Sequence, residues 1–131
     1  MKKLFFIAIC ASIIGLNACS KQPKAIEERV QARWDALFSD DITEAYSYIS
    51  PGYRSSVSEQ HYRNKLARQA VVWVTANYDS HQCEADVCNV NVNLTYRVTN
   101  PLPGVKNWES TQQVDEKWIK VKGKWYFLPE K

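Results

Sequence analysis

The strongest constraint on the fold of this chain is a stretch in which apolar and polar residues alternate from residue 89 to residue 98. Successive side chains of a β-strand point to opposite faces, so this period of two predicts a strand with one buried face. The apolar set is Val90, Val92, Leu94, Tyr96 and Val98, and the polar set is Asn89, Asn91, Asn93, Thr95 and Arg97. The polar face is expected to be either solvated or a surface through which two sheets pair.

Three further strands are expected around this one. Residues 71–74 are β-branched or aromatic and begin a strand that reaches Tyr78 or beyond. Residues 100–104 contain two prolines and a glycine, so they are expected to end the alternating strand and to open a loop that includes Trp108. A third strand is expected at about 109–121, and a turn at 122–124 leads into a closing strand at 125–128.

Helices are expected before the first strand. Residues 25–39 carry an apolar stripe at helical spacing, and a shorter helix follows, capped by residues 39–41 and stopped by residues 50–52. A third helix begins at Ser56 or Ser58, with Tyr62, Leu66 and Ala70 on its inner face. Helices followed by an antiparallel meander predict an α+β domain. The polar side of the first helix is Glu27, Glu28, Arg29, Gln31 and Arg33.

The first twenty residues resemble a bacterial lipoprotein signal. Two lysines precede an apolar run at 4–16 that is too short to span a bilayer, and Leu16 and Ala18 match the residues that precede a lipidated cysteine in this pattern. Asn17 is larger and more polar than the pattern prefers, and the alternative is a plain secretory peptide. The resemblance implies a signal peptide at 1–18, a lipidated tether at 19–24 and one domain at 25–131, with a covalent lipid on Cys19 and no other cofactor.

The expected location is the periplasmic side of the outer membrane, because Ser20 replaces the Asp that retains such proteins in the inner membrane. The chain has a formal net charge of +3, and two of its basic residues leave with the signal. The domain that remains is close to neutral and has no basic stripe, so a nucleic acid is not expected as a partner.

Cysteine usage predicts one disulfide. Cys10 leaves with the signal and Cys19 takes the lipid, which leaves Cys83 and Cys88 as a pair across a short hairpin in an exported protein. The alternative is that His81 and these two cysteines bind zinc, but a fourth ligand is not evident. We expect no metal.

The domain also resembles the NTF2-like, cystatin-related superfamily of cone-shaped domains, and within it the small envelope lipoproteins of Gram-negative bacteria. The resemblance rests on residues 33–37, the Ala45-Tyr46 step, residues 50–54, the two hairpin cysteines and the closing segments 116–121 and 123–126. It implies a curved sheet wrapped around the helices, with a cavity at the open end.

Enzymes of this superfamily place an Asp or an Asp-His pair in that cavity. The candidates here are Asp35, His61, Asp79 and His81, and all four are expected on the surface. No catalytic residue is therefore assigned.

The expected function is a non-enzymatic binding or accessory module of the cell envelope, held by lipid to the membrane. A SnoaL-like or isomerase-like enzyme or carrier and a structural subunit of an envelope assembly are the alternatives. An envelope protein or a second copy, bound through the sheet, is the expected partner. The residues that either fill the core or contact a ligand or partner are Trp34, Tyr46, Trp73, Trp108 and Trp118.

Overall fold

The computed structural model describes residues 25–130. The predicted signal peptide at 1–18, the tether at 19–24 and the lipidation site Cys19 lie outside the described residues. No helix in the described range is both long enough and apolar enough to cross a bilayer.

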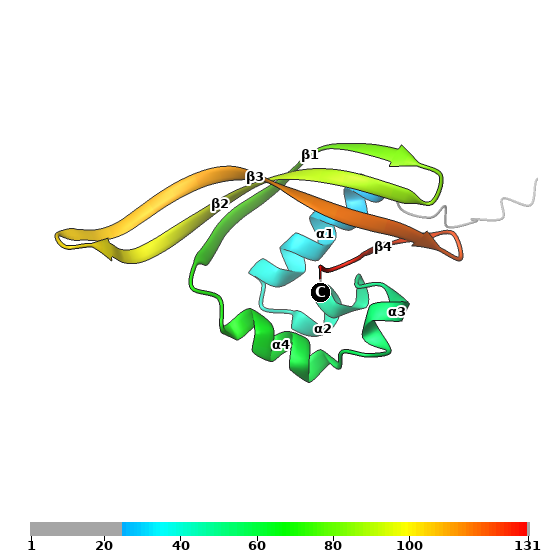
Figure 1. The fold of residues 1–131 in the computed structure, drawn as a ribbon, viewed down its shortest axis with the longest axis horizontal. Helices are drawn as coiled ribbons and strands as arrows, with labels where there is room; N and C mark the ends of the chain where they lie inside the picture. Colours follow the sequence, from blue (N-terminus) through cyan, green and yellow to red (C-terminus); the bar gives the residue numbers. More distant parts are fainter. Residues whose placement is uncertain (1–24, 131) are drawn as a thin grey trace, which may run out of the picture.

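Four helices precede four strands, and the strands form one open antiparallel sheet in the order β1-β2-β3-β4 (Figure 1). The predicted α+β class is therefore confirmed. The helices all lie on one face of the sheet (Figure 1). The elements are α1 (Ile26–Phe38), α2 (Ile42–Ser47), α3 (Pro51–Arg54), α4 (Glu59–Ala67), β1 (Val72–Glu84), β2 (Val87–Leu102), β3 (Val105–Val121) and β4 (Lys124–Phe127).

The helix starts follow the capping residues in the sequence. Asp41 accepts a hydrogen bond from the Glu44 backbone N–H at 3.0 Å at the start of α2, and Ser58 accepts one from His61 at 3.2 Å at the start of α4. α2 ends at Ser47, just before the predicted stop at residues 50–52, and Ser50 instead caps α3, a short helix that the sequence pattern did not predict. Pro51 suits the first turn of a helix because its missing N–H would have had no partner there.

Two predicted boundaries are wrong. Ala70 does not belong to the inner face of α4, because the helix ends at Ala67 and Ala70 is exposed. The expected loop after residue 100 is instead a tight turn, so Trp108 lies in β3. Pro101 is accommodated because it falls in the irregular pairing between Thr99 and Leu102, where the regular ladder is interrupted.

The main core lies between α1 and the inner face of the sheet. The alternation in β2 is confirmed, because Val90, Val92 and Leu94 are buried and pack with Val30 and Trp34 of α1. A smaller cluster joins α2 to α4 through Ile42, Ile49 and Tyr62. Trp118 of β3 is fully buried and belongs to the main core.

The paired ends of β2 and β3 project beyond the rest of the sheet. Pairing of β1 with β2 begins at Val72 opposite Arg97, so residues 98–108 form a two-stranded ribbon, which we call the arm. The arm extends away from the helices, at the left of Figure 1. The start of α1 lies at the opposite end of the sheet, where Arg29 donates a hydrogen bond to the carbonyl of Trp125 (Figure 1).

Candidate functional site

A buried ion pair joins α1 to β3. Arg33 Nη1 donates to Glu116 Oε1 at 2.9 Å, and Trp118 Nε1 donates to Glu116 Oε2 at 2.9 Å. The guanidinium also stacks on the ring of Phe127, 3.8 Å from its centroid. The expectation that Arg33 lies on the solvated side of its helix is therefore wrong. Both oxygens of the carboxylate are bonded, so Glu116 has little capacity to act as a base.

A pocket of about 190 Å³ opens beside this ion pair, between α4, the start of β1 and the end of the chain. Among its lining residues, Arg33 Nε and the Tyr62 hydroxyl are buried and have no hydrogen-bond partner among the described residues. Trp73 and Phe127 supply aromatic surface, and Lys65 adds a second cation. The pocket can therefore hold a small ligand that accepts hydrogen bonds and carries an apolar body.

The five residues that the sequence suggested as ligand or partner contacts lie in different parts of the structure. Trp73 lines this pocket, whereas Trp34 and Trp118 are buried in the main core. Tyr46 is half-buried and donates its hydroxyl to the carbonyl of Val57 at 2.6 Å, so it ties α2 to the segment before α4. Trp108 is exposed on the arm and lies in a strand rather than in the expected loop.

Sequence reasoning missed Arg33, Tyr62 and Phe127 as pocket residues. The helical stripe placed Tyr62 on an inner face, which was a usable signal for burial but not for a pocket. Phe127 lies on the closing strand, and its contact with Arg33 depends on the sheet order rather than on any local pattern.

The candidate acids and bases are dispersed. Asp35, His61, Asp79 and His81 are all exposed. His81 Nδ1 lies 2.6 Å from the Tyr78 hydroxyl. Burial raises the pKa of Tyr78, and the charges of Glu27 and Asp79 raise it further.

The expected disulfide between Cys83 and Cys88 is present at the β1–β2 hairpin. This bond overturns the zinc alternative, because both thiolates that would bind the metal are consumed. Within residues 25–130 there is no group of three His, Cys, Asp or Glu side chains arranged to hold a metal ion.

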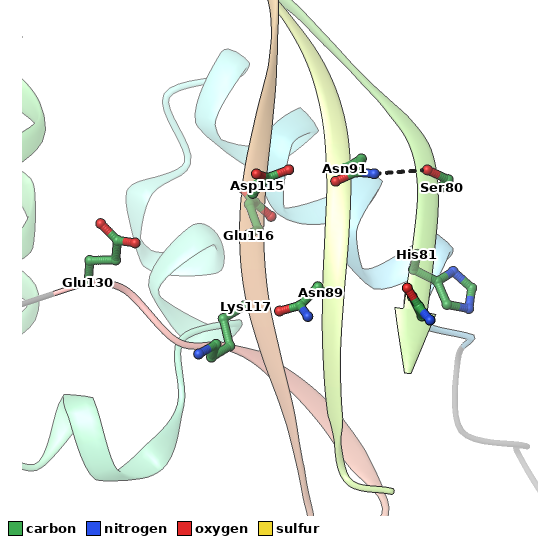
Figure 2. A pocket seen from close by; sticks show the side chains of 9 residues that line it. Ser80, His81, Asn89, Asn91, Asp115, Glu116, Lys117 and Glu130 are labelled. Carbon is green, nitrogen blue, oxygen red and sulfur yellow. Dashed lines mark hydrogen bonds between the residues drawn. The ribbon is translucent and has the colours of Figure 1, made fainter. Parts of the chain in front are cut away.

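The outer face of the sheet carries a shallow polar hollow, seen in Figure 2, where Asn91 donates to the Ser80 hydroxyl at 3.2 Å. A bulge at Asp79 turns its carboxylate across the sheet, so it accepts from Asn93 and from Gln113, both at 3.2 Å. Farther along, Thr95 bonds Thr111 at 2.7 Å, and Arg97 bonds Glu109 at 2.7 Å. This face is therefore a ladder of polar groups that already have partners within the domain.

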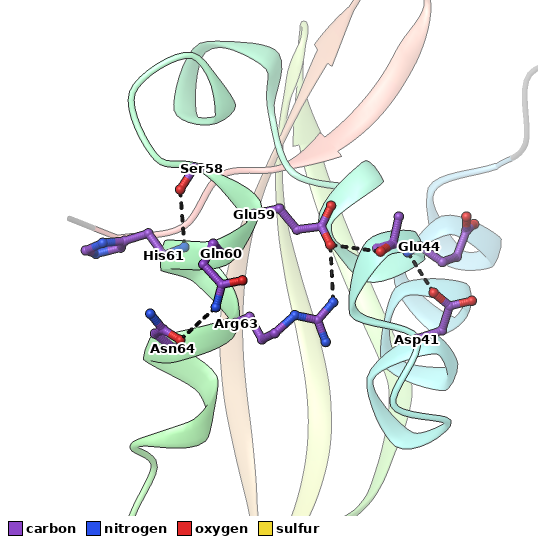
Figure 3. A network of polar contacts seen from close by, with 9 residues as sticks. Asp41, Glu44, Ser58, Glu59, Gln60, His61, Arg63 and Asn64 are labelled. Carbon is purple, nitrogen blue, oxygen red and sulfur yellow. Dashed lines mark hydrogen bonds and ion pairs between the residues drawn. The ribbon is translucent and has the colours of Figure 1, made fainter.

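A second polar network lies between α2 and α4 (Figure 3). Glu59 Oε1 accepts from Thr43 at 2.8 Å and from Arg63 at 3.2 Å. Figure 3 also shows the Gln60 side chain bonded to Asn64. These groups are partly or fully exposed and connect helices, so we assign the network a structural role.

The arm carries three of the six large apolar side chains that are exposed in the described part of the chain. Leu102 at its tip is 67% exposed and Trp108 is 49% exposed, with Val105 between them also open to solvent. Trp108 meets Tyr96 edge to face, with ring centroids 6.1 Å apart. Because two strands alone bury little surface, apolar side chains in such an arm are better explained by a contact than by stability.

The solution structure of a SEC-C motif-containing protein from Rhodopseudomonas palustris is similar to this chain, with a TM-score of 0.60 and 14% sequence identity. The similarity covers 80% of this chain and 76% of that one. It shows a shared fold, with helices followed by an antiparallel sheet. No model of a known protein family matches the sequence, and no curated protein is detectably similar to it.

Proposed function

We propose that this protein is a lipid-anchored lipoprotein of the bacterial envelope that acts as a non-enzymatic binding module. In this proposal Cys19 carries the lipid, the domain faces the periplasm from the outer membrane, and the arm binds an envelope protein. The observation that supports it most is the position of the arm, whose exposed apolar residues lie at the end of the sheet opposite the start of α1.

The position of the arm opposite the start of α1 is important because the proposed anchor precedes α1 by only a few residues. The tether at 19–24 would reach about 20 Å when fully extended. A lipid at Cys19 would therefore hold the α1 end of the domain near the membrane and direct the arm away from it. Several acyl chains make such attachment effectively permanent, at about 0.8 kcal/mol for each buried methylene.

The hydrogen bonding and exposure of the acidic side chains support a function without catalysis. Glu116 is the buried carboxylate nearest the pocket, and its two oxygens accept from Arg33 and Trp118. Asp35 and Asp79, the acids singled out from the sequence, are exposed and bonded to surface amides, and Glu130, which lines the pocket, is exposed to solvent. General acid-base catalysis at an apolar site needs a carboxyl or imidazole group free to exchange a proton there.

We further propose that the fold is an NTF2-like cone whose open end is the pocket beside Arg33. This supports a second candidate function, that of a small-molecule carrier, because the Tyr62 hydroxyl and Arg33 Nε lie in the pocket wall and have no hydrogen-bond partner within residues 25–130. Benzoate, with one carboxylate and one ring, is a suitable probe. Chemical-shift changes at Tyr62 and Trp73 on titration, lost in Tyr62→Phe, would support the carrier, and an unchanged spectrum would exclude this ligand class.

The binding function is tested by recovering the full-length protein from membranes after mild crosslinking and identifying what comes with it. We expect one envelope protein to be enriched with the wild type and to be recovered several-fold less with Leu102→Ser. Val72→Ser is the matched control, because Val72 is also exposed but lies on β1 outside the arm. Equal recovery with both variants would contradict a role for the arm.

The anchor is tested separately by labelling cells with a fatty-acid analogue. The label is expected on the wild type and absent from Cys19→Ala, which should leave the membrane fraction. Incorporation into Cys19→Ala would refute the assignment of the lipidated residue.

A further inference from the structure

A second pocket, of about 280 Å³, adjoins the pocket beside Arg33. Leu66, Gln69 and Trp73 line both pockets, so the two lie on either side of these side chains. The other apolar residues that line the second pocket are Leu37, Ile42, Ala67 and Val71. The first pocket therefore contains polar groups without partners, whereas the second offers mainly apolar surface.

Both pockets follow the boundary between the two core clusters. Trp73 packs against the main cluster, whereas Leu66 packs against the cluster that joins α2 to α4. α4 packs mainly on α2 and lies below the sheet in Figure 1. Among the described residues, Leu37 and Phe127 are the half-buried apolar side chains that pack against both clusters. The space beneath α4 is therefore closed by few side chains, and a thin ligand can enter it.

The first pocket determines which polar group a ligand needs. Arg33 and Tyr62 are only 4% and 5% exposed, yet Arg33 Nε and the Tyr62 hydroxyl have no hydrogen-bond partner within residues 25–130. A carboxylate offers two acceptor oxygens, one for each of these donors. Lys65 also lines the pocket and supplies a positive charge, because Arg33 is already neutralised by Glu116. The one acid that lines this pocket, Glu130, is exposed, so water screens its charge.

The second pocket is a poor place for the same carboxylate. Arg63 is the cation that lines it, but its guanidinium donates to Glu59 at 3.2 Å and its side chain is 42% exposed. Asp40 lines the second pocket as well and would repel a carboxylate. The buried donors therefore favour a polar head beside Arg33, with the second pocket left for an apolar tail.

We propose that the two pockets together bind one unbranched fatty acid of medium chain length. Its carboxylate accepts from Arg33 Nε and the Tyr62 hydroxyl, and its chain passes between Leu66 and Trp73 into the second pocket. This inference rests on the carrier function proposed above. Each pocket alone is smaller than the roughly 300–1,000 Å³ that is typical of ligand sites, whereas the two joined fall within that range. A flexible chain fits such a narrow connection, and a rigid ring would fill the first pocket only.

The test is equilibrium dialysis of radiolabelled ligands against the full-length protein in phospholipid nanodiscs, with empty nanodiscs as the blank. Decanoate is expected to bind at least tenfold more tightly than benzoate, because its chain buries more apolar surface. It is also expected to bind at least tenfold more tightly than decanol, which has one oxygen and no charge.

The outcomes separate this inference from the carrier function. Equal affinity for decanoate and benzoate would overturn the fatty-acid proposal and leave the carrier function in place. Equal affinity for decanoate and decanol would also overturn it, because the carboxylate would then not be recognised. Failure of all three ligands to bind would overturn both proposals.

The position of the tail is tested at Ala67, which is exposed and lines the second pocket but not the first. Ala67→Phe is expected to fill the second pocket, to weaken decanoate binding at least tenfold and to leave benzoate binding unchanged. Ala70→Phe is the matched control, because Ala70 is also exposed and lines neither pocket. Equal affinity for decanoate in the two variants would contradict a tail in the second pocket.

The position of the carboxylate is tested at Lys65 and Tyr62. Lys65→Gln is expected to weaken decanoate binding several-fold and to leave decanol binding unchanged, with Lys124→Gln, at an exposed lysine of β4, as the matched control. Tyr62→Phe keeps the ring that packs on Tyr46 and is expected to weaken decanoate binding without lowering the urea midpoint. Equal losses for decanoate and decanol in Lys65→Gln, or full affinity for decanoate in Tyr62→Phe, would overturn the assignment of the head.

Discussion

Arg33 and Glu116 form an ion pair of 2.9 Å although their side chains are only 5% and 6% exposed. The pair joins the middle of α1 to β3 across a sequence separation of 83 residues. Phe127 covers the guanidinium from one side and Trp118 satisfies the second carboxylate oxygen. The fold therefore places a charge pair where the sheet and its helices meet.

Glu116→Gln is predicted to destabilise the domain strongly. The amide oxygen can still accept from Trp118, but the Arg33 charge remains buried without its counter-ion. Removing one partner of a buried pair costs about 3–5 kcal/mol. Urea unfolding followed by tryptophan fluorescence measures the change.

The control is Glu109→Gln on the same strand, which breaks the exposed pair with Arg97. This pair contributes at most about 1 kcal/mol because water and salt screen it. If the two substitutions cost the same, the ion pair would not be buried as described.

Gln31→Leu is predicted to loosen the β1 edge. The substitution keeps a side chain of similar size but leaves the Ala76 carbonyl and the Tyr78 N–H without a partner. Leaving such groups unsatisfied costs about 1–3 kcal/mol in partly buried surroundings. Hydrogen exchange at the Tyr78 amide is expected to accelerate.

Gln60→Leu is the matched control, because in the described part of the chain the Gln60 side chain bonds only the exposed side chain of Asn64. It should leave both stability and exchange at Tyr78 nearly unchanged. Unaltered exchange in Gln31→Leu would show that its amide does not protect the edge.

These two interactions mark the limit of sequence-based prediction for this chain. The alternation in β2 predicted its buried face because each residue's orientation follows from its neighbours. Likewise Ser58 indicated the start of α4, because its side chain accepts a hydrogen bond from a backbone N–H only three residues later in the chain. Burial of Arg33 depends on a carboxylate 83 residues away, so the helical pattern alone placed it with the solvated residues.

The arm is a second feature that the local sequence predicted only in part. Prolines and a glycine at 100–104 indicated a chain break, and the chain does reverse there, at Gly104 with a positive φ of 83°. The ladder between Val98 and Trp108 forms nevertheless, because the bulge before Leu102 removes the need for a regular bond at Pro101. Whether a turn is tight or opens a loop depends on this pairing, which local composition does not determine.

Alkaline pH is predicted to destabilise the domain partly through Tyr48. Burial raises the pKa of Tyr48 and neighbouring Glu44 raises it further, although Arg29 lowers it. The folded pKa lies above the unfolded value of about 10, so the stability that neutral Tyr48 contributes is fully present below pH 10 and is lost as pH rises. The loss is limited to about 1.4 kcal/mol per pH unit for one group.

Urea midpoints measured from pH 7 to pH 11.5 test this effect. Tyr48→Phe is expected to show a shallower loss of stability above pH 10 than the wild type, and the two should follow parallel curves below it. The same slope in both proteins at every pH would exclude a contribution from Tyr48.

The two tryptophans of β3 are predicted to lose very different amounts of stability when each is replaced by leucine. Trp118 is fully buried and bonds Glu116, so Trp118→Leu should cost about 3–5 kcal/mol through lost packing and a carboxylate oxygen left without its donor. Trp108 is half exposed and meets only Tyr96 edge to face, so Trp108→Leu should cost about 1 kcal/mol. Differential scanning calorimetry measures both, and fluorescence of Trp108→Leu should lose its most quenchable component. A large loss of stability in Trp108→Leu would mean that the arm is held by the domain rather than open to a partner.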